Sequence, residues 1–239
     1  MLQVDQIHVY YGQSYVLQGV SLRVEEGQIV GLLGRNGVGK TTTIRTVVGF
    51  MHPRRGRIIF KGHEINKQPA YEIARLGIGL IPQGRRLFRS LSVYEHLALG
   101  THKNQSNQTW DLQRVYDLFP RLEERRDQVA HTLSGGEQSM LSVGRALMMN
   151  PSLLVMDEPT EGLAPIVVQQ VSSAVASLKA EKQSILLVEQ NMGFALDVAD
   201  IIYVMSKGRI VFSGTPEELK DRIDIESRYL GIGKTDENL

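Results

Sequence analysis

The chain has 239 residues, of which 42% are hydrophobic, and this is enough apolar material for one large domain with a well-filled core. Its 27 basic and 26 acidic side chains leave a formal charge of +1, so its overall charge does not attract nucleic acid or anionic lipid. The absence of cysteine excludes disulfides and thiolate metal sites. Neither a signal peptide nor an apolar run near the roughly 20 residues of a membrane helix is visible, so we expect a soluble chain.

The first third of the chain has the patterns of strands joined by tight turns. Apolar and polar residues alternate over 2–10 and over 16–24, which predicts a pair of antiparallel strands. The continuous apolar run 29–33 predicts a short buried strand, and 58–60 predicts another strand. A glycine-rich loop after residue 33 leads into a segment with the apolar spacing of a helix.

The middle of the chain, approximately 84–150, changes from strand patterns to helix patterns, and we interpret it as an inserted, mostly helical subdomain. Strands and helices alternate after residue 150, which predicts a largely parallel sheet. The polar tail 231–239 is predicted to fray. The predicted segments from residue 84 onward are 94–99, 112–119, 138–148, 153–156, 166–178, 185–188, 192–199, 201–205 and 210–213.

The glycine-rich loop after the strand 29–33 matches the pattern G-x-x-x-x-G-K-[ST] at every position. Backbone N–H groups of such a loop surround phosphate oxygens, and the helix that follows adds a favourable dipole. We expect Lys40 to reach the β- and γ-phosphates of ATP and the Thr41 hydroxyl to help hold Mg²⁺. Kinases, GTPases and motors share this loop, so it leaves the reaction open. The predicted nucleotide-binding residues here are Gly34, Arg35, Asn36, Gly37, Val38, Gly39, Lys40, Thr41 and Thr42.

Two carboxylates follow the predicted strand 153–156. Asp157 stands where a strand-end carboxylate can hold Mg²⁺, usually through water. Glu158 is placed to polarise a water molecule for in-line attack on the γ-phosphate. Exposed acidic strand ends are common, and it is the phosphate-binding loop upstream that favours the catalytic interpretation.

A second helix start suited to phosphate lies in the helical middle region, where the chain reads Ser134-Gly135-Gly136-Glu137-Gln138. A capping box alone would explain the serine and the glutamate, but not the two glycines at this distance before the acidic pair. One chain that uses one nucleotide has no need of a second phosphate site. We therefore expect two chains to dock head to tail, so that each completes the ATP site of the other.

With these motifs in this order, residues 1–230 resemble the ABC ATPases, a family whose signature is LSGGQ. The resemblance implies an α/β fold, namely a P-loop NTPase core with a mixed, largely parallel sheet, an N-terminal antiparallel β part and an inserted α-helical subdomain. It also implies that Tyr11 stacks on adenine and that Gln83 contacts both nucleotide and Mg²⁺ and links the core to the helical part. The segment 161–163 is expected to cross the dimer interface.

One position departs from the family pattern. Most members have a histidine after the strand that corresponds to 185–188, where it contacts the γ-phosphate, and this chain has Gln190. A glutamine amide can donate a hydrogen bond to phosphate but cannot titrate. Either Gln190 is a working substitute, or this subunit's site is slower than that of its partner. We predict the former, with some loss of rate.

The stretches 34–37, 82–86, 157–165 and 188–191 resemble the second ATPase subunit of branched-chain or hydrophobic amino acid importers. Urea and short-chain amide importers have similar sequences. The resemblance implies a peripheral position on the cytoplasmic face of the membrane. It also implies a heteromeric complex with a different ATPase subunit, two permeases and, indirectly, a substrate-binding protein, but no nucleic acid.

Other functions remain to be compared. A soluble ABC ATPase acting on DNA or ribosomes would have a coiled-coil insertion or two nucleotide domains, and a small-molecule P-loop kinase would not need the segment 134–136. An exporter ATPase for lipid or lipopolysaccharide has the same motifs and stays open. Apolar side chains after Gln83 fit either internal packing or a groove for a short permease helix. These side chains are Leu87, Phe88, Leu91, Val93 and Tyr94.

Overall fold

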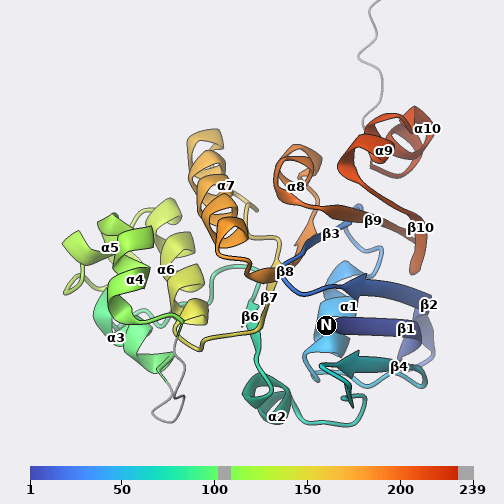
Figure 1. Ribbon diagram of the computed structural model, residues 1–239, viewed down its shortest axis with the longest axis horizontal. Helices are drawn as coiled ribbons and strands as arrows, with labels where there is room; N and C mark the ends of the chain where they lie inside the picture. Colours follow the sequence, from blue (N-terminus) through green and yellow to red (C-terminus); the bar gives the residue numbers. More distant parts are fainter. Residues whose placement is uncertain (102–108, 231–239) are drawn as a thin grey trace, which may run out of the picture.

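Two β-sheets of different construction carry the structure, a computed structural model that describes residues 1–101 and 109–230 (Figure 1). The first sheet is antiparallel and has the order β2-β1-β4-β5. The tail 231–239, predicted to fray, lies outside the described residues. The strands of this sheet are β1 (Leu2–Tyr11), β2 (Ser14–Val24), β4 (Arg55–Phe60) and β5 (His63–Glu64).

The second sheet has the order β10-β9-β3-β8-β7-β6, and its strands run parallel except for the edge strand β10. Its central strands are buried on both faces, which is why they read as continuous apolar runs rather than alternating ones. The prediction of a mixed, largely parallel sheet with an antiparallel N-terminal part is confirmed. The strands are β3 (Ile29–Leu33), β6 (Ile78–Ile81), β7 (Leu153–Asp157), β8 (Ser184–Glu189), β9 (Ile201–Ser206) and β10 (Arg209–Gly214).

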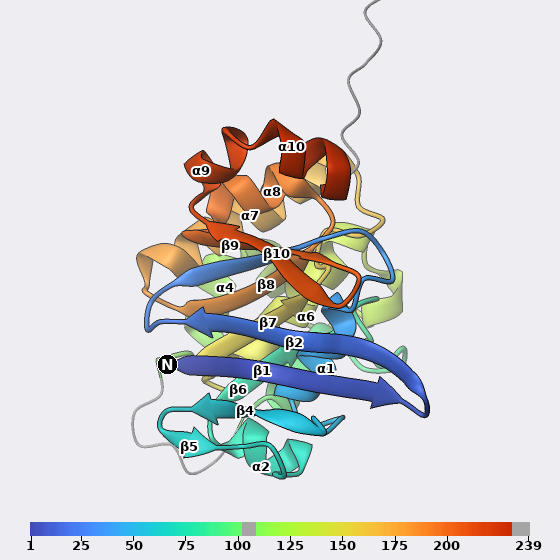
Figure 2. The ribbon, with the colours of Figure 1, turned by 90° about the vertical axis from the view of Figure 1, so that its right-hand side faces the viewer.

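The core consists of two apolar clusters on opposite faces of the parallel sheet. Alternate residues of β3 belong to different clusters, because successive side chains of a strand point to opposite faces. Val30 and Leu32 face the antiparallel sheet, with helix α1 (Lys40–Val47) between the two sheets (Figure 2). Ile29 and Leu33 face the helices on the other side. Those helices include α7 (Pro165–Ala180) and α8 (Met192–Val198).

The helices between β6 and β7 form a lobe beside the parallel sheet (Figure 1). Its two best-defined helix starts are capping boxes, Ser92 with Glu95 and Ser134 with Glu137. No helix in the described part of the chain is long and apolar enough to cross a bilayer. The lobe contains α3 (Val93–Leu99), α4 (Leu112–Leu118), α5 (Pro120–Glu124) and α6 (Gly135–Leu147), and the other short helices are α2 (Ala70–Arg75), α9 (Pro216–Lys220) and α10 (Ile223–Ile225).

Parallel strands bring several loops to one edge of the sheet, because their carboxyl ends lie on the same side. In the register of the sheet, Leu33 of β3 lies opposite Glu189 of β8, and Asp157 of β7 lies opposite Val188. The loop after β3, the acidic pair after β7 and the turn after β8 therefore meet, although more than a hundred residues separate the first from the second.

The turn between β9 and β10 joins the glycine-rich loop to the antiparallel sheet. Gly208 donates its backbone N–H to the Val38 carbonyl and accepts from the Gln18 N–H, both at 2.8 Å. Its φ of +76° is a left-handed conformation, and a Cβ there would lie 2.1 Å from the Val16 carbonyl oxygen. Only glycine fits this junction, which fixes the position of the loop that follows β3.

Candidate functional site

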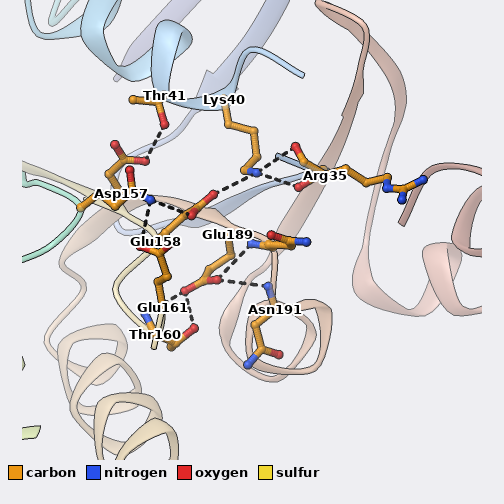
Figure 3. A network of polar contacts seen from close by, with 12 residues as sticks. Arg35, Lys40, Thr41, Asp157, Glu158, Thr160, Glu161, Glu189 and Asn191 are labelled. Carbon is orange, nitrogen blue, oxygen red and sulfur yellow. Dashed lines mark hydrogen bonds and ion pairs between the residues drawn. The ribbon is translucent and has the colours of Figure 1, made fainter. Parts of the chain in front are cut away.

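The side chain of Lys40 lies at the centre of the site, at the start of α1 (Figure 3). Its Nζ donates to the carbonyls of Gly34 at 2.7 Å and Arg35 at 3.1 Å, so the lysine closes the glycine-rich loop on itself. The same Nζ forms an ion pair with Glu158 Oε1 at 3.0 Å, and both side chains are buried. The cation that is predicted to bind phosphate is thus paired with the predicted catalytic carboxylate.

Asp157 is a buried carboxylate at the end of β7 and accepts a hydrogen bond from the Thr41 hydroxyl at 3.3 Å. Burial, and then the neighbouring charge of Glu158, raise the pKa of Asp157 to about 6. Burial and the charge of Glu158 outweigh the opposing effects of the Thr41 hydroxyl and of Lys40. The oxygens of Asp157 and Thr41 are hard ligands of the kind that Mg²⁺ prefers. Among the described residues, His, Cys, Asp and Glu form no metal-binding group of three or more.

The backbone of Glu158 has an unusual conformation. Its φ is +50°, in the left-handed region that non-glycine residues seldom adopt. Its N–H donates to the Val188 carbonyl at 2.9 Å, which holds this turn against the end of β8. Backbone strain of this kind is found where a functional side chain must take one direction, and here it directs the carboxylate to Lys40 (Figure 3).

Gln83 lies in the site, but between two carboxylates. Its Nε2 donates to Glu158 Oε2 at 3.3 Å and to Glu161 Oε2 at 2.8 Å. The structure brings Gln83 together with the glycine-rich loop, and its contacts with nucleotide and Mg²⁺ stay predictions. The cavity that these elements enclose has a volume of about 290 Å³ and is lined by Val16, Asn36, Gly37, Gly39, Lys40, Thr41, Thr42, Gln83 and Glu158.

Tyr11 lies at the end of β1, where it pairs with Ser14 at the turn into β2, and its side chain is 45% exposed. Val16, further along β2, lines the cavity around Lys40, whereas Tyr11 does not. The predicted stacking of Tyr11 on adenine therefore stays a prediction.

The serine-glycine motif forms the start of α6 and lines no part of the cavity around Lys40. The Ser134 hydroxyl accepts from the Glu137 N–H at 3.3 Å, and the Glu137 carboxylate accepts from the Ser134 N–H at 2.9 Å. Glu137 also forms an ion pair with Arg125 at 2.7 Å, so its carboxylate serves the helix start. It stays a prediction that this motif contacts nucleotide, and this applies to Ser134, Gly135, Gly136, Glu137 and Gln138 alike.

Gln190 is exposed at the turn after β8, and its backbone N–H donates to its neighbour Glu189 at 3.0 Å. The sequence patterns did not single out Glu189, which is 2% exposed and also binds Thr160 in the loop after Glu158. The signal that was available is a charged residue at the end of an otherwise apolar strand. A buried carboxylate at this position needs several hydrogen-bond donors around it.

A second residue that the patterns missed is His96 in α3, which is completely buried. Its Nε2 accepts from the Phe88 N–H at 2.9 Å, and its Nδ1 donates to the Ser92 carbonyl at 2.9 Å. Only a neutral imidazole with its proton on Nδ1 satisfies both partners, and burial lowers the pKa of His96 accordingly. His96 thereby fixes the backbone of Phe88, whose side chain is 56% exposed.

Comparisons with known proteins agree with this geometry. The family model described as ABC transporter matches residues 17–161. BraG, the high-affinity branched-chain amino acid transport ATP-binding protein of Pseudomonas aeruginosa, is 44% identical over 97% of this chain and 100% of its own length. LptB, the lipopolysaccharide export system ATP-binding protein of Escherichia coli K12, is 36% identical over 90% of this chain and 91% of its own length.

Solved structures give the same result. A nucleotide-free ATP-binding cassette from an ABC transporter superposes with a TM-score of 0.82 at 30% identity, covering 92% of this chain and 94% of that one. The family model covers more than half of the chain, and the relatives align over nearly all of it. The chain therefore belongs to the ATP-binding subunits of ABC transporters and is an ATPase of that family.

Proposed function

We propose that the chain energises the uptake of branched-chain or other hydrophobic or neutral amino acids through partner permeases. The observation that carries this proposal is the 44% identity to BraG over 97% of this chain and the whole of BraG. The complex would contain a second, different ATPase subunit and two permeases, with a substrate-binding protein supplying the cargo. The chain would lie on the cytoplasmic face of the membrane. Importers of urea or short-chain amides are the alternative within this class.

An exporter is the second candidate, because LptB relatives are 34% to 36% identical over at least 90% of this chain. The residues described above serve ATP in either direction of transport. The lower identity of the export relatives favours import.

The geometry of the site supports a separate role for each of its side chains in ATP hydrolysis. Phosphate oxygens of ATP would take Lys40 from Glu158, and the released carboxylate would then orient the attacking water. Thr41 and Asp157 would hold Mg²⁺, which neutralises charge on the β- and γ-phosphates. Gln190, at the end of β8, would donate its amide to the γ-phosphate. Glu158 and Gln190 are thus the proposed catalytic residues.

The serine-glycine motif at the start of α6 would complete the ATP site of a second subunit. Its contacts with the γ-phosphate exist only when the two subunits close, so ATP would favour the closed pair. Hydrolysis removes that difference in affinity, and the pair reopens. The permeases would follow each transition.

The surface after Gln83 supplies a contact for the permeases. Phe88 and Tyr94 are 56% and 45% exposed, whereas Val93 is buried in the core. Both interpretations of this apolar stretch therefore apply, each to different residues. Val93 serves internal packing, whereas Phe88 and Tyr94 are exposed and available for a permease. We propose that Phe88 and Tyr94 receive a short cytoplasmic helix of a permease.

The raised pKa of Asp157 predicts how pH acts on the protein without metal or nucleotide. An acid whose folded pKa lies above its unfolded value loses stability as pH rises between the two, here from about 4 to about 6. Asp157→Asn should therefore raise the thermal unfolding midpoint at pH 8 by about twice as much as at pH 5. It should also abolish stabilisation by Mg²⁺ with ATP. The control is Asp197→Asn, on the exposed face of α8, which should change neither. Equal shifts at both pH values would contradict this electrostatic account.

The role of Gln190 is tested by ATPase rates of the assembled complex. Gln190→Ala removes the amide donor and should lower kcat about tenfold or more, the usual effect of losing one hydrogen bond to the reacting group. Gln190→His should hydrolyse ATP at the wild-type rate or faster, because an imidazole can donate the same bond and can also titrate. Full activity of Gln190→Ala would show that this side chain makes no catalytic contact.

Uptake of labelled leucine by the reconstituted complex tests both the cargo and the contact surface. Phe88→Glu places a charge on the permease-facing surface and should abolish uptake while the paired ATPase subunits, without permeases, hydrolyse ATP at the wild-type rate. Tyr71→Glu is the control, since Tyr71 is an aromatic residue with a similar exposure of 60% and belongs to a different helix, α2. If wild-type complex takes up no amino acid, the import proposal fails. If Phe88→Glu transports normally, the contact surface lies elsewhere.

A further inference from the structure

Glu189 is a buried carboxylate that holds two loops of the site at once (Figure 3). Its Oε1 accepts from the Thr160 N–H at 3.0 Å and from the Thr160 hydroxyl at 2.7 Å. Its Oε2 accepts from the N–H groups of Gln190 at 3.0 Å and Asn191 at 3.1 Å. Both oxygens therefore have their donors, and these come from the loop after β7 on one side and the turn after β8 on the other.

No basic side chain in the described part of the chain forms an ion pair with Glu189. Burial raises the pKa of this carboxyl, while the four donors favour its charged form. A buried charge without a counter-ion is costly, and an apolar residue would end β8 at a lower cost, as in the four residues before it. The carboxylate therefore serves the loops that surround it rather than the packing of the sheet.

The two loops that Glu189 joins contain the proposed catalytic residues. Glu158 lies two residues before Thr160, and its own N–H is bonded to Val188, the residue before Glu189. Gln190 directly follows Glu189 and donates its backbone N–H to it. The position of the water-orienting carboxylate and that of the γ-phosphate donor thus depend on the same side chain.

We propose that Glu189 is a positioning residue for ATP hydrolysis, which holds the loops of Glu158 and Gln190 as one unit. The segment 161–163 continues directly from Thr160, so a second subunit that docks on this segment would move both catalytic groups together. The inference rests on the roles of Glu158 and Gln190 proposed above, and it adds the residue that sets their mutual geometry.

The chemistry of an amide makes Glu189→Gln a sharp test. A carboxylate offers acceptors to all four donors, whereas an amide must turn an NH₂ group toward one of the loops. If the NH₂ group turns toward Thr160, the Thr160 hydroxyl can rotate and accept a hydrogen bond from it, but the Thr160 N–H loses its acceptor. If the NH₂ group turns toward the other loop, the N–H groups of Gln190 and Asn191 both lose their acceptor. In either orientation one of the two loops loses at least one of its hydrogen bonds to residue 189.

The experiment measures steady-state ATP hydrolysis by the assembled complex and the thermal unfolding of the full chain. Glu189→Gln should lower kcat about tenfold and leave KM for ATP within about twofold, because the phosphate-binding loop is untouched. Thr160→Val removes only the hydroxyl donor and should lower kcat about threefold, while Thr160→Ser restores the donor and should restore the rate. A merely structural residue would lower stability without this separation of kcat from KM.

Several results would overturn the inference. These are a kcat of Glu189→Gln within twofold of wild type, a loss confined to KM, or equal rates for Thr160→Val and wild type. If Glu189→Gln does not fold, the Thr160 pair decides the question alone. Hydrolysis without amino acid uptake would contradict the proposed function and leave the role of Glu189 standing. Full activity of Gln190→Ala would exclude a contact of Gln190 with the γ-phosphate. Glu189 would then act on kcat through the position of Glu158 only, and the Thr160→Val variant would measure that effect.

Discussion

The ion pair between Lys40 and Glu158 is the contact on which the site depends. Both side chains are buried, 3.0 Å apart, and Lys40 also holds two carbonyls of its own loop. Removing one partner from such a pair leaves an uncompensated buried charge, which is costly. The phosphates of ATP can replace the carboxylate as partner of Lys40. Under the proposed function, binding of nucleotide and release of the Glu158 carboxylate would be one event.

The rest of the fold places these two residues together. Lys40 follows β3 and Glu158 follows β7, and β8 lies between those strands in the sheet. The left-handed backbone of Glu158 and its bond to Val188 direct the carboxylate toward the loop. The β9–β10 turn holds the loop from its other side at Gly208. Movement of any of these contacts would change the separation of lysine and glutamate.

Much of this arrangement could be predicted from the sequence, because it depends on local patterns. The strand Ile29–Leu33 was predicted with the correct bounds, and the glycine-rich loop and the acidic pair follow strands as expected. Helices such as α2 and α5 were not predicted, since five or six residues are too few to show a periodicity. The capping role of Glu137 was visible in the sequence as an alternative to a nucleotide contact.

Contacts between distant loops could not be predicted. The bonds of Glu189 to Thr160 depend on the pairing of β7 with β8, a register that no local pattern specifies. The two donor bonds of Gln83 to carboxylates depend likewise on where β6 ends beside β7. The backbone of Phe88 is held by His96, eight residues further along the chain, and no local pattern indicates this bond.

The exchange of partners at Lys40 is tested most directly by the affinity for a non-hydrolysable ATP analogue, measured by calorimetry. Glu158→Gln removes the competitor for Lys40 and should bind the analogue at least about fivefold more tightly than the wild type. Glu161→Gln removes a nearby carboxylate that binds Gln83 rather than Lys40, and it should change the affinity much less. Equal or weaker binding by Glu158→Gln, or an equal gain in both variants, would contradict the account.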